Sequence, residues 1–251
     1  ANNRKLLNTN VMATIGGEPI TSKTLDDMEE VGFQRHLFVP SYGMAEACLR
    51  VTLAVGSEVR VVDGAVSVGF LPRDAVTGRS IRIADGEGQI IDDGLVGEIF
   101  IAGPDVSVGY WNKPDLEHQF CCKLSDGREY FATGDLGKVV DQRLYVVGRL
   151  KELIIINGRN VYPTDIERIV EAEYPDIVRP GSTVAYQRTD SDIGLVLEIR
   201  KTVAAAELFP ELISADSVRR LIFDANQVDV GQMIALQQGT VPKTSSGKLK
   251  R

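Results

Sequence analysis

The stretch Gly148–Glu167, GRLKELIIINGRNVYPTDIE, marks the point where the character of this chain changes. Before it, from Val59 to Val147, apolar and polar residues alternate in short runs separated by Asp-Gly or glycine-rich turns, a pattern typical of strands and hairpins. After it, helical periods return between strand-like runs. The stretch therefore predicts a boundary between two domains, which we place so that residues 1–149 form one and residues 150–251 the other.

The C-terminal part predicts a small α+β domain of about 100 residues, the size of an ordinary domain. Its expected elements are a strand over Leu153–Ile156, a helix from Thr164, a hairpin over Thr183–Ile199 around Ser191-Asp192, and a helix over Ala215–Asp224. Thr164-Asp165-Ile166-Glu167 fits the capping box, in which a threonine and a glutamate bond each other's backbone N–H groups at a helix start. We assign Thr164 this stabilising role and no catalytic one.

The N-terminal part predicts a mixed α/β segment followed by a barrel-like or hairpin-rich β region. Val11–Ile15 indicates a short strand that stops at a glycine pair, and Thr21–Val31 carries apolar residues at helical spacing. Phe38–Tyr42 is extended and breaks at Gly43, after which helix formers resume. The expected fold class is α/β and α+β.

Composition excludes several functions. The chain has 251 residues, of which 43% are hydrophobic and 25% charged, and its net charge of -7 argues against binding to nucleic acid or anionic membranes. No apolar run approaches the roughly 20 residues that span a bilayer. Three cysteines, two of them adjacent at Cys121 and Cys122, form no disulfide framework or metal motif, so we expect a reducing compartment, the cytoplasm.

Several familiar catalytic motifs are absent. The closing segment Pro242–Lys248, PKTSSGK, has proline where the Walker loop needs its first glycine, and Leu249 where it needs a hydroxyl. Ile91 replaces the last glycine of the dinucleotide-binding fingerprint. His36 and His118 lack a nucleophile-elbow partner and are expected at the surface or at helix ends.

Five stretches, taken together, carry a resemblance. They are GGEP at 16–19, YGMAEA at 42–47, YFATGDLG at 130–137, the stretch at 148–167, and PKTSSGKLKR at 242–251. In this order and approximate spacing, the chain resembles the adenylate-forming superfamily of acyl-CoA synthetases, peptide-synthetase adenylation domains and luciferases. Ala45 in YGMAEA, the GRNVYPTDIE segment and VRPG at 178–181 are most similar to the fatty acyl-AMP ligases.

The resemblance implies a nucleotide site in the N-terminal part. Gly16 and Gly17 would leave room for a flat ring against the main chain, and Tyr42 would offer an aromatic face on its other side. The alternatives are an ordinary glycine turn and a core aromatic residue. The full set that the family's motifs place around the nucleotide is Gly16, Gly17, Glu18, Pro19, Tyr42, Gly43, Met44, Ala45, Thr133, Asp135 and Arg149.

The same resemblance assigns individual roles. Glu46 would hold Mg²⁺ against the ATP phosphates, since a hard cation prefers oxygen ligands. Asp135 would accept the ribose hydroxyls while Arg149 donates to the ribose from across the cleft. Lys151 corresponds to the superfamily's hinge, or is simply a linker lysine. Lys248 would be the catalytic cation, delivered to the reacting phosphate by its small, hydroxyl-rich loop, rather than part of a frayed basic tail.

The activity implied is ATP-dependent formation of an acyl-adenylate from a fatty acid, followed by transfer to the phosphopantetheine thiol of an acyl carrier protein. Two alternatives stay open. CoA could be the acceptor, because only residues 50–65 separate YGMAEACL from the next strand-like segment, where the ligases carry an insertion. A non-catalytic adenylation-like module could bind a nucleotide or acyl ligand. The chain lacks an initiator methionine and a glycine-rich phosphate loop, so we expect it to be a fragment from the middle of a longer protein, without the N-terminal part.

Overall fold

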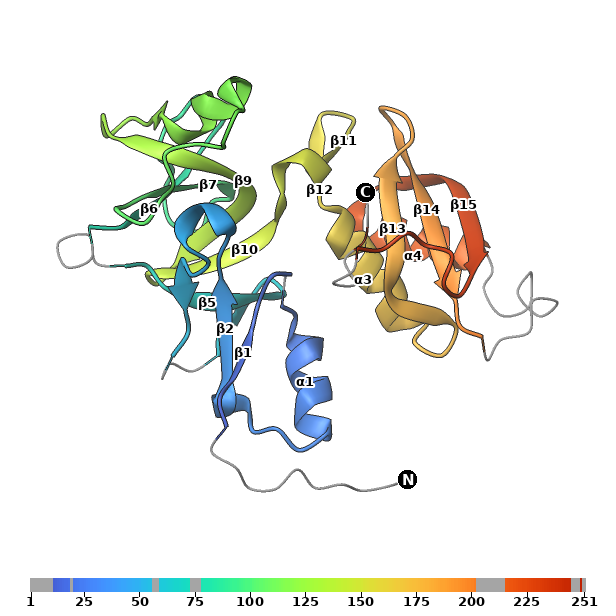
Figure 1. The fold of residues 1–251 in the computed structure, drawn as a ribbon. Helices are drawn as coiled ribbons and strands as arrows, with labels where there is room; N and C mark the ends of the chain where they lie inside the picture. The colour runs from blue at the N-terminus through green and yellow to red at the C-terminus, as the bar shows by residue number, and fades with distance from the viewer. Residues whose placement is uncertain are drawn as a thin grey trace. The chain divides into compact units, whose positions relative to one another are not determined.

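The computed structural model describes residues 11–18, 20–55, 59–72, 78–201, 215–244 and 249. Its internal contacts divide the chain into two compact units, Ala1–Leu150 and Lys151–Arg251. The sequence had placed the boundary between Arg149 and Leu150. Each unit has its own hydrophobic core, so we describe each by itself (Figure 1).

The first unit contains ten strands, one α-helix and three 3-10 helices among the residues described. Its elements are β1 (Ala13–Ile15), α1 (Ser22–Glu30), η1 (Arg35–Leu37), β2 (Phe38–Tyr42), η2 (Ala45–Ala47), β3 (Thr52–Leu53), β4 (Val61–Val62), β5 (Ala65–Phe70), β6 (Ser80–Ala84), β7 (Gly97–Ala102), η3 (Pro114–Phe120), β8 (Cys122–Lys123), β9 (Glu129–Val140) and β10 (Arg143–Arg149). η4 (Leu150–Glu152) lies at the boundary.

The strands of this unit form two sheets. β1 pairs parallel with β2, and β2 pairs antiparallel with β3. The larger sheet has the order β4-β5-β10-β9-β7-β6, with β8 paired to the start of β9. Its pairs are all antiparallel, and β4–β5, β6–β7 and β9–β10 are hairpins, as the alternating pattern predicted. Among the described residues no pairing joins the outer strands β4 and β6. The hairpin-rich prediction is confirmed, and the sheet is open rather than closed into a barrel.

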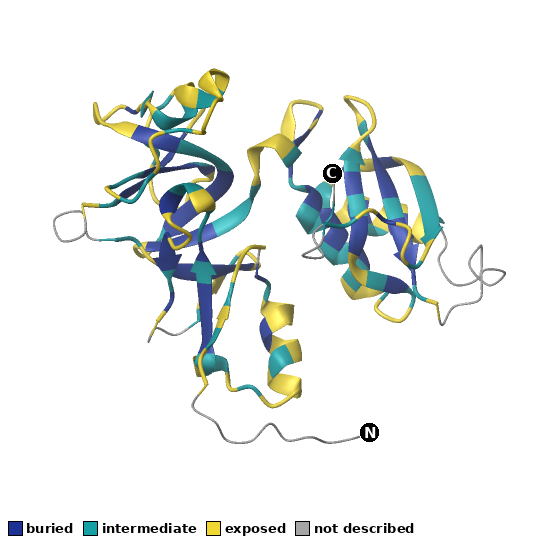
Figure 2. Ribbon diagram, in the orientation of Figure 1, coloured by how far each residue is buried: buried dark blue, intermediate teal, exposed yellow. Residues whose placement is uncertain are grey.

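Burial follows the strand alternation. Figure 2 shows the middle strands of the large sheet largely buried and the connecting turns exposed. Ile99 and Ile101 of β7 point into one cluster with Val139 and Leu144, while Phe100 packs on the opposite face. α1 begins after Thr21, whose hydroxyl accepts the Thr24 N–H at 3.0 Å, and buries Leu25 against Phe38 of β2. β2 and β9, from the small and the large sheet, thus lie in the same compact unit.

The second unit is an α+β fold with a single core. Its elements are β11 (Ile154–Ile156), β12 (Arg159–Val161), α3 (Pro163–Glu173), β13 (Val178–Gln187), β14 (Asp192–Ile199), α4 (Ala215–Asn226) and β15 (Asp229–Gln237). β13 and β14 form the predicted antiparallel hairpin. Two features were missed, the short β11–β12 hairpin and β15, which pairs parallel with β14 across the α4 connection. Both helices pack on this sheet around Ile166, Val170, Leu195, Leu197 and Ile222.

The capping-box prediction for Thr164 is wrong. α3 begins one residue earlier, with Pro163 at its first turn and Tyr162 as the N-cap, and it has no side-chain cap. Proline at this position suits a helix start because its missing N–H would be unpaired there anyway. The Glu167 carboxylate accepts instead the backbone N–H of Ala185 on β13, at 2.8 Å. The glutamate joins helix to sheet rather than closing the helix end.

Other sequence expectations can be checked directly. His36 and His118 are both exposed and lie in the short helices η1 and η3. The cysteines Cys48, Cys121 and Cys122 are free thiols. Within the described part of the chain, no helix has the length and apolar character to cross a membrane.

Glu198 is a fully buried carboxylate at the end of β14. Its Oε1 accepts a hydrogen bond from Arg179 Nη1 at 2.5 Å, and its Oε2 accepts the backbone N–H of Val241 at 2.9 Å. Burial works to raise the pKa of Glu198, but the hydrogen bonds from Arg179 and from the backbone of Gly239 and Val241 outweigh it and hold the pKa below its usual value. Glu198 thus fixes the start of the C-terminal segment to the sheet.

This depressed pKa gives the protein an acid-sensitive element. Because the folded-state pKa of Glu198 lies below its unfolded value, the stabilisation is complete above about pH 4.3, the ordinary glutamate pKa, and is lost as the pH falls through the folded-state pKa. We expect Glu198→Gln to cost about 1–3 kcal/mol at pH 7. Urea unfolding of the wild type and the variant should differ most at pH 7 and converge toward pH 3.

A matched control is Asp224→Asn on the exposed face of α4, for which we expect little change at any pH. If the difference between wild type and Glu198→Gln were the same at pH 7 and pH 3, Glu198 would not be held ionised in the folded protein.

Candidate adenylate site

A tight turn presents Glu46. The chain leaves β2 at Tyr42, passes through η2 and returns to β3, with Leu49 N–H bonded to Met44 O and Val51 N–H bonded to Tyr42 O, both at 2.9 Å. A Cβ on Gly43 would lie only 1.5 Å from the carbonyl oxygen of Leu49, so no other residue fits there. Gly43 is therefore explained by this close backbone approach.

The Glu46 side chain is partly buried and has a hydrogen-bond donor. The Tyr110 hydroxyl donates to Glu46 Oε1, and the Ser107 N–H and hydroxyl donate to the Glu46 carbonyl oxygen at 2.8 and 3.2 Å. Partial burial and the adjacent carboxylate raise the pKa of Tyr110 to about 12, so the phenol keeps its proton at neutral pH. Met44 packs against the core behind this turn, and Ala45 is exposed.

The second part of the site is a kink in β9. The Thr133 hydroxyl donates to Ile99 O at 2.7 Å and accepts the Asp135 N–H at 3.1 Å. Gly134 has a φ of 70°, a left-handed conformation that favours glycine, and its N–H donates to Glu98 Oε1 at 2.9 Å. These bonds fix the backbone on both sides of the kink and orient the Asp135 carboxylate.

Asp135 brings three of the predicted residues together. Tyr42 donates its hydroxyl proton to Asp135 Oδ2 at 2.8 Å, and Arg149 Nε lies 3.1 Å from Oδ1. Arg149 sits directly opposite Asp135 in the β9–β10 pairing, and its donation to the ribose from across the cleft stays a prediction. Cross-strand neighbours necessarily lie side by side. The Asp135 side chain is 10% exposed, whereas that of Arg149 is 66% exposed.

Burial shapes the titration of this cluster. Burial, with the negative charge of Asp135 beside it, raises the pKa of Tyr42 far above its usual range, so Tyr42 acts only as a neutral donor. Burial also raises the pKa of Glu98, an effect that the Gly134 N–H opposes and the charge of Asp135 reinforces. Tyr42 as a whole is 8% exposed and packs in the main core, so little of its side chain is open to solvent.

The glycine pair follows β1. A Cβ on Gly16 would lie 2.5 Å from Ser41 Oγ and 2.6 Å from Ser41 O, so Gly16 allows β1 to approach β2. Gly17 has a φ of 85° and turns the chain away from the sheet. Glu18 is exposed. Local backbone packing thus accounts for Gly16, and the adenine-binding role of this turn stays a prediction.

Two predicted residues, Pro19 and Lys248, lie outside the described residues. Lys151 is exposed in η4, at the boundary between the units. Lys243, near the start of the Lys248 segment, donates to Gly181 O at 2.7 Å, and Gly181 belongs to VRPG at the start of β13. The stem of that segment is therefore attached to the second unit.

Sequence reasoning missed two residues of the site, Glu98 and Tyr110. Glu98 could have been found from the sequence. It lies two residues before Phe100 and so on the same face of the strand as that buried residue, where a charged side chain needs a hydrogen-bond partner. Tyr110 could not have been found in this way, since nothing in the sequence distinguishes it from its neighbour Trp111, which is 97% exposed.

The residues present fit one divalent cation shared with a bound nucleotide. Among the described residues no group of three or more histidine, cysteine or acidic side chains could hold a metal by itself. Mg²⁺, however, commonly uses one or two carboxylates together with substrate phosphates. Glu46 offers one such carboxylate, with Oε1 bonded to Tyr110.

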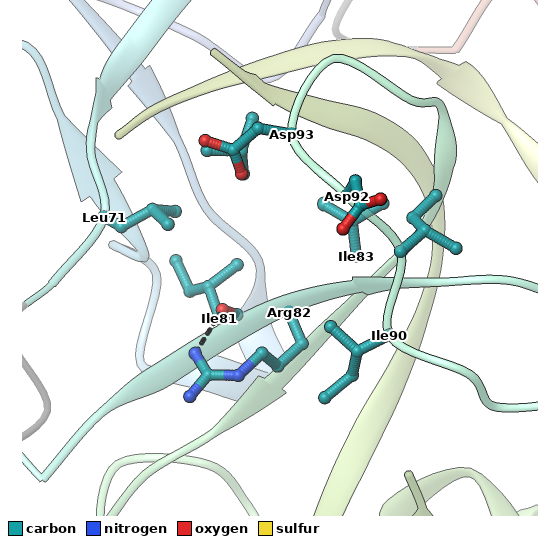
Figure 3. Close-up of a pocket in the computed structure, with 9 residues that line it drawn as sticks. Leu71, Ile81, Arg82, Ile83, Ile90, Asp92 and Asp93 are labelled. Atoms are coloured by element: carbon teal, nitrogen blue, oxygen red, sulfur yellow. Dashed lines mark hydrogen bonds between the residues drawn. The ribbon is translucent and has the colours of Figure 1, made fainter. Parts of the chain in front are cut away.

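A separate hollow of about 160 Å³ lies in the large sheet (Figure 3). Aliphatic side chains including Leu71 and Ile81 line it together with the carboxylates of Asp92 and Asp93, and Arg82 donates to the Ile81 carbonyl at its edge. Ligand pockets usually measure about 300–1,000 Å³. The hollow is smaller and contains none of the predicted nucleotide residues, so we do not assign a ligand to it.

Comparison with known proteins identifies the class. Residues 1–111 match the family model described as AMP-binding enzyme. The fold matches a solved structure from studies of fatty acyl-adenylate ligases of E. coli and L. pneumophila, with a TM-score of 0.79 and 29% identity over 96% of this chain and 45% of that one. The chain is therefore similar to AMP-binding, adenylate-forming enzymes, in sequence over its first 111 residues and in fold over nearly all of its length.

Particular relatives are fatty-acid ligases. The chain is 30% identical over 270 residues to the medium-chain-fatty-acid acyl-carrier-protein ligase JamA of Moorena producens, covering 95% of this chain and 45% of the relative. It is 30% identical over 245 residues to the long-chain-fatty-acid AMP ligase FadD26 of Mycobacterium tuberculosis, covering 84% of this chain and 41% of the relative. The chain thus spans less than half the length of these curated relatives.

The Tyr42–Asp135 bond can be measured by a double-mutant cycle. Because a buried hydrogen bond to a charged group contributes more than a neutral one, we expect Tyr42→Phe and Asp135→Asn to show a coupling of about 1–3 kcal/mol in urea unfolding. Tyr42→Phe combined with Asp85→Asn, in a turn that shares no partner with Tyr42, should be additive. Additivity of both pairs would mean that the bond does not hold β2 to β9.

Proposed function

We propose that the protein activates a fatty acid as its acyl-adenylate, using ATP and releasing pyrophosphate. The observation that carries the proposal is the bonded cluster of Tyr42, Asp135 and Arg149, each of which comes from a different one of the family's motifs. Similarity to fatty acyl-adenylate ligases and to fatty-acid ligases supports the choice of a fatty acid as the substrate.

In the proposed reaction the fatty carboxylate oxygen attacks the α-phosphorus of ATP. A carboxylate–phosphorus bond forms, the bond to the bridging oxygen of the β-phosphate breaks, and pyrophosphate leaves with its electron pair. Two anions must meet, so the main barrier is electrostatic, and cationic groups aimed at the reacting phosphate lower it. The products are acyl-AMP and pyrophosphate.

Each site residue has a role in this proposal. Asp135 accepts hydrogen bonds from the ribose hydroxyls, and Arg149, whose side chain is largely exposed, neutralises the carboxylate and donates to the ribose. Tyr42 holds the Asp135 carboxylate in place as a neutral donor. The Gly16–Pro19 turn and the Gly43–Ala45 backbone contact the base and phosphates, and Thr133 fixes the kink that carries Asp135.

Glu46 is the proposed ligand of Mg²⁺, which when bound neutralises phosphate charge as a Lewis acid. Lys248 is the proposed catalytic cation, and Lys151 the proposed hinge that lets residues 150–251 act as a small mobile lid on the large domain. The Lys243–Gly181 bond supports this assignment because it attaches the Lys248 segment to the unit that would move.

The proposed acceptor is the phosphopantetheine thiol of an acyl carrier protein, which displaces AMP from the adenylate to leave a thioester. The name of JamA, an acyl-carrier-protein ligase, supports this choice. The reaction would take place in the cytoplasm. CoA is the second candidate acceptor, because only residues 50–65 separate YGMAEACL from the next strand-like segment, where the ligases carry an insertion.

The test is to measure ATP–pyrophosphate exchange with the full-length protein that the gene encodes. We expect fatty-acid-dependent exchange, and a loss of at least about 100-fold in Lys248→Ala, with nucleotide binding nearly unchanged because the group acts on the transition state. Lys250→Ala, two residues further along the chain, is the matched control and should keep most of the activity.

Three outcomes discriminate the candidates. Binding of an acyl-adenylate mimic without exchange in the wild type would support a non-catalytic module. Exchange that is unaffected by Lys248→Ala would remove the catalytic assignment of that lysine. With exchange established, offering CoA and an acyl carrier protein in the same assay would identify the acceptor.

A further inference from the structure

One short loop holds Glu46 by both its main chain and its side chain. Ser107 donates to the Glu46 carbonyl oxygen through its N–H and its hydroxyl, at 2.8 and 3.2 Å. Three residues later the Tyr110 hydroxyl donates to Glu46 Oε1. The loop and the Glu46 turn are far apart in sequence, so these bonds are tertiary contacts that place one particular carboxylate.

Tyr110 is itself anchored to the strand that carries Asp135. Its ring meets Phe120 edge to face, with centroids 5.2 Å apart and planes at 77°. Phe120 contacts Phe131 with centroids 4.6 Å apart, and Phe131 lies on β9 just before the Thr133–Asp135 kink. Aromatic pairs of this geometry are favourable beyond their buried area. Although Tyr110 is 37% exposed, these ring contacts connect it through Phe120 to β9.

In the hydrogen bond between Tyr110 and Glu46, the tyrosine hydroxyl is the donor. An ionised carboxylate only accepts hydrogen bonds, so Tyr110 is the donor and uses its single proton on Oε1. Among the described residues, Glu46 Oε2 has no recorded hydrogen-bond partner. A carboxylate held by one oxygen, on a partly buried side chain, presents the other oxygen in a defined direction. Such support is what the outer partners of metal-binding carboxylates provide.

We propose that Tyr110 is a positioning residue that orients the Glu46 carboxylate toward the divalent cation of the nucleotide complex. This inference rests on the proposed function, because it takes Glu46 as the cation ligand. Tyr110 does not touch the cation or the substrate; it acts through Glu46. Removing its hydroxyl leaves the carboxylate charge in place but releases its orientation.

The test compares Tyr110→Phe with the wild type in binding of Mn²⁺, the probe ion, to the protein in the presence of a non-cleavable ATP analogue. Electron paramagnetic resonance of free Mn²⁺ gives the dissociation constant without any turnover. Loss of an outer partner typically weakens metal binding about 10- to 100-fold, so we expect a rise of at least about 10-fold. Trp111→Phe, at the exposed neighbouring position, should stay within about twofold of the wild type.

Two further measurements exclude a merely structural effect. In the Glu46→Gln background, Tyr110→Phe should change the Mn²⁺ dissociation constant little, because the hydroxyl acts only through that carboxylate. In exchange assays Tyr110→Phe should raise the half-saturating Mg²⁺ concentration while the rate at saturating Mg²⁺ stays near that of the wild type. Thermal unfolding of each variant confirms that it is folded.

Unchanged Mn²⁺ affinity in folded Tyr110→Phe would overturn the proposal, as would an equal loss in the Glu46→Gln background. Absence of Mn²⁺ binding by the wild type would overturn it as well. Failure of the proposed function is a different result: no fatty acid would support exchange, while the Mn²⁺ measurements would still decide the role of Tyr110.

Discussion

The charge of Asp135, held between a phenol and a guanidinium, is the constraint on which the first unit depends. Its two oxygens accept bonds from Tyr42 and Arg149, so one carboxylate connects the end of β2 to the hairpin of β9 and β10. These partners come from distant parts of the sequence, and a nearly buried carboxylate is stable only when it is paired. A second polar link between the two sheets runs from Arg79, just before β6, to the carbonyl oxygens of Arg50 and Val51, just before β3, both at 2.8 Å.

The Glu46 turn is positioned by a second and chemically different set of contacts. Gly43 lets the turn close, Ser107 holds its main chain, and Tyr110 holds its carboxylate. The aromatic contacts from Tyr110 through Phe120 lead back to β9, the strand that carries Asp135. Asp135, the proposed ribose ligand, and Glu46, the proposed metal ligand, are thus both connected to β9. Movement of either side chain is therefore opposed by the packing of that strand in the sheet.

Local patterns predicted the elements better than their connections. Strand alternation and helical spacing located β2, α1, the β13–β14 hairpin and α4, because each depends on residues close in sequence. The start of α3 was predicted wrongly because the Glu167 carboxylate accepts a hydrogen bond from the backbone of β13 instead of capping its own helix. β15 was missed because it pairs with β14 only after a crossover connection. Periodicity carries no information about such long-range partners.

The same division applies to the site. Motifs singled out Tyr42, Glu46 and Asp135, and two of these do form a direct bond. The motifs could not show that Arg149 lies beside Asp135, since that follows from strand register, nor that Tyr110 contacts Glu46, since that follows from the path of a turn-rich loop. Resemblance to a family predicts which residues belong to a site, whereas strand pairing determines which of those residues are in contact.

Trp111 gives this arrangement an optical consequence. It is the only tryptophan of the chain, it is 97% exposed, and it directly follows the tyrosine bonded to Glu46. Indole emission responds to the polarity of its surroundings, so the native fluorescence spectrum reports on one loop alone. Any molecule or segment that covers this loop will shift the emission to shorter wavelength, which makes the unlabelled protein its own sensor at that position.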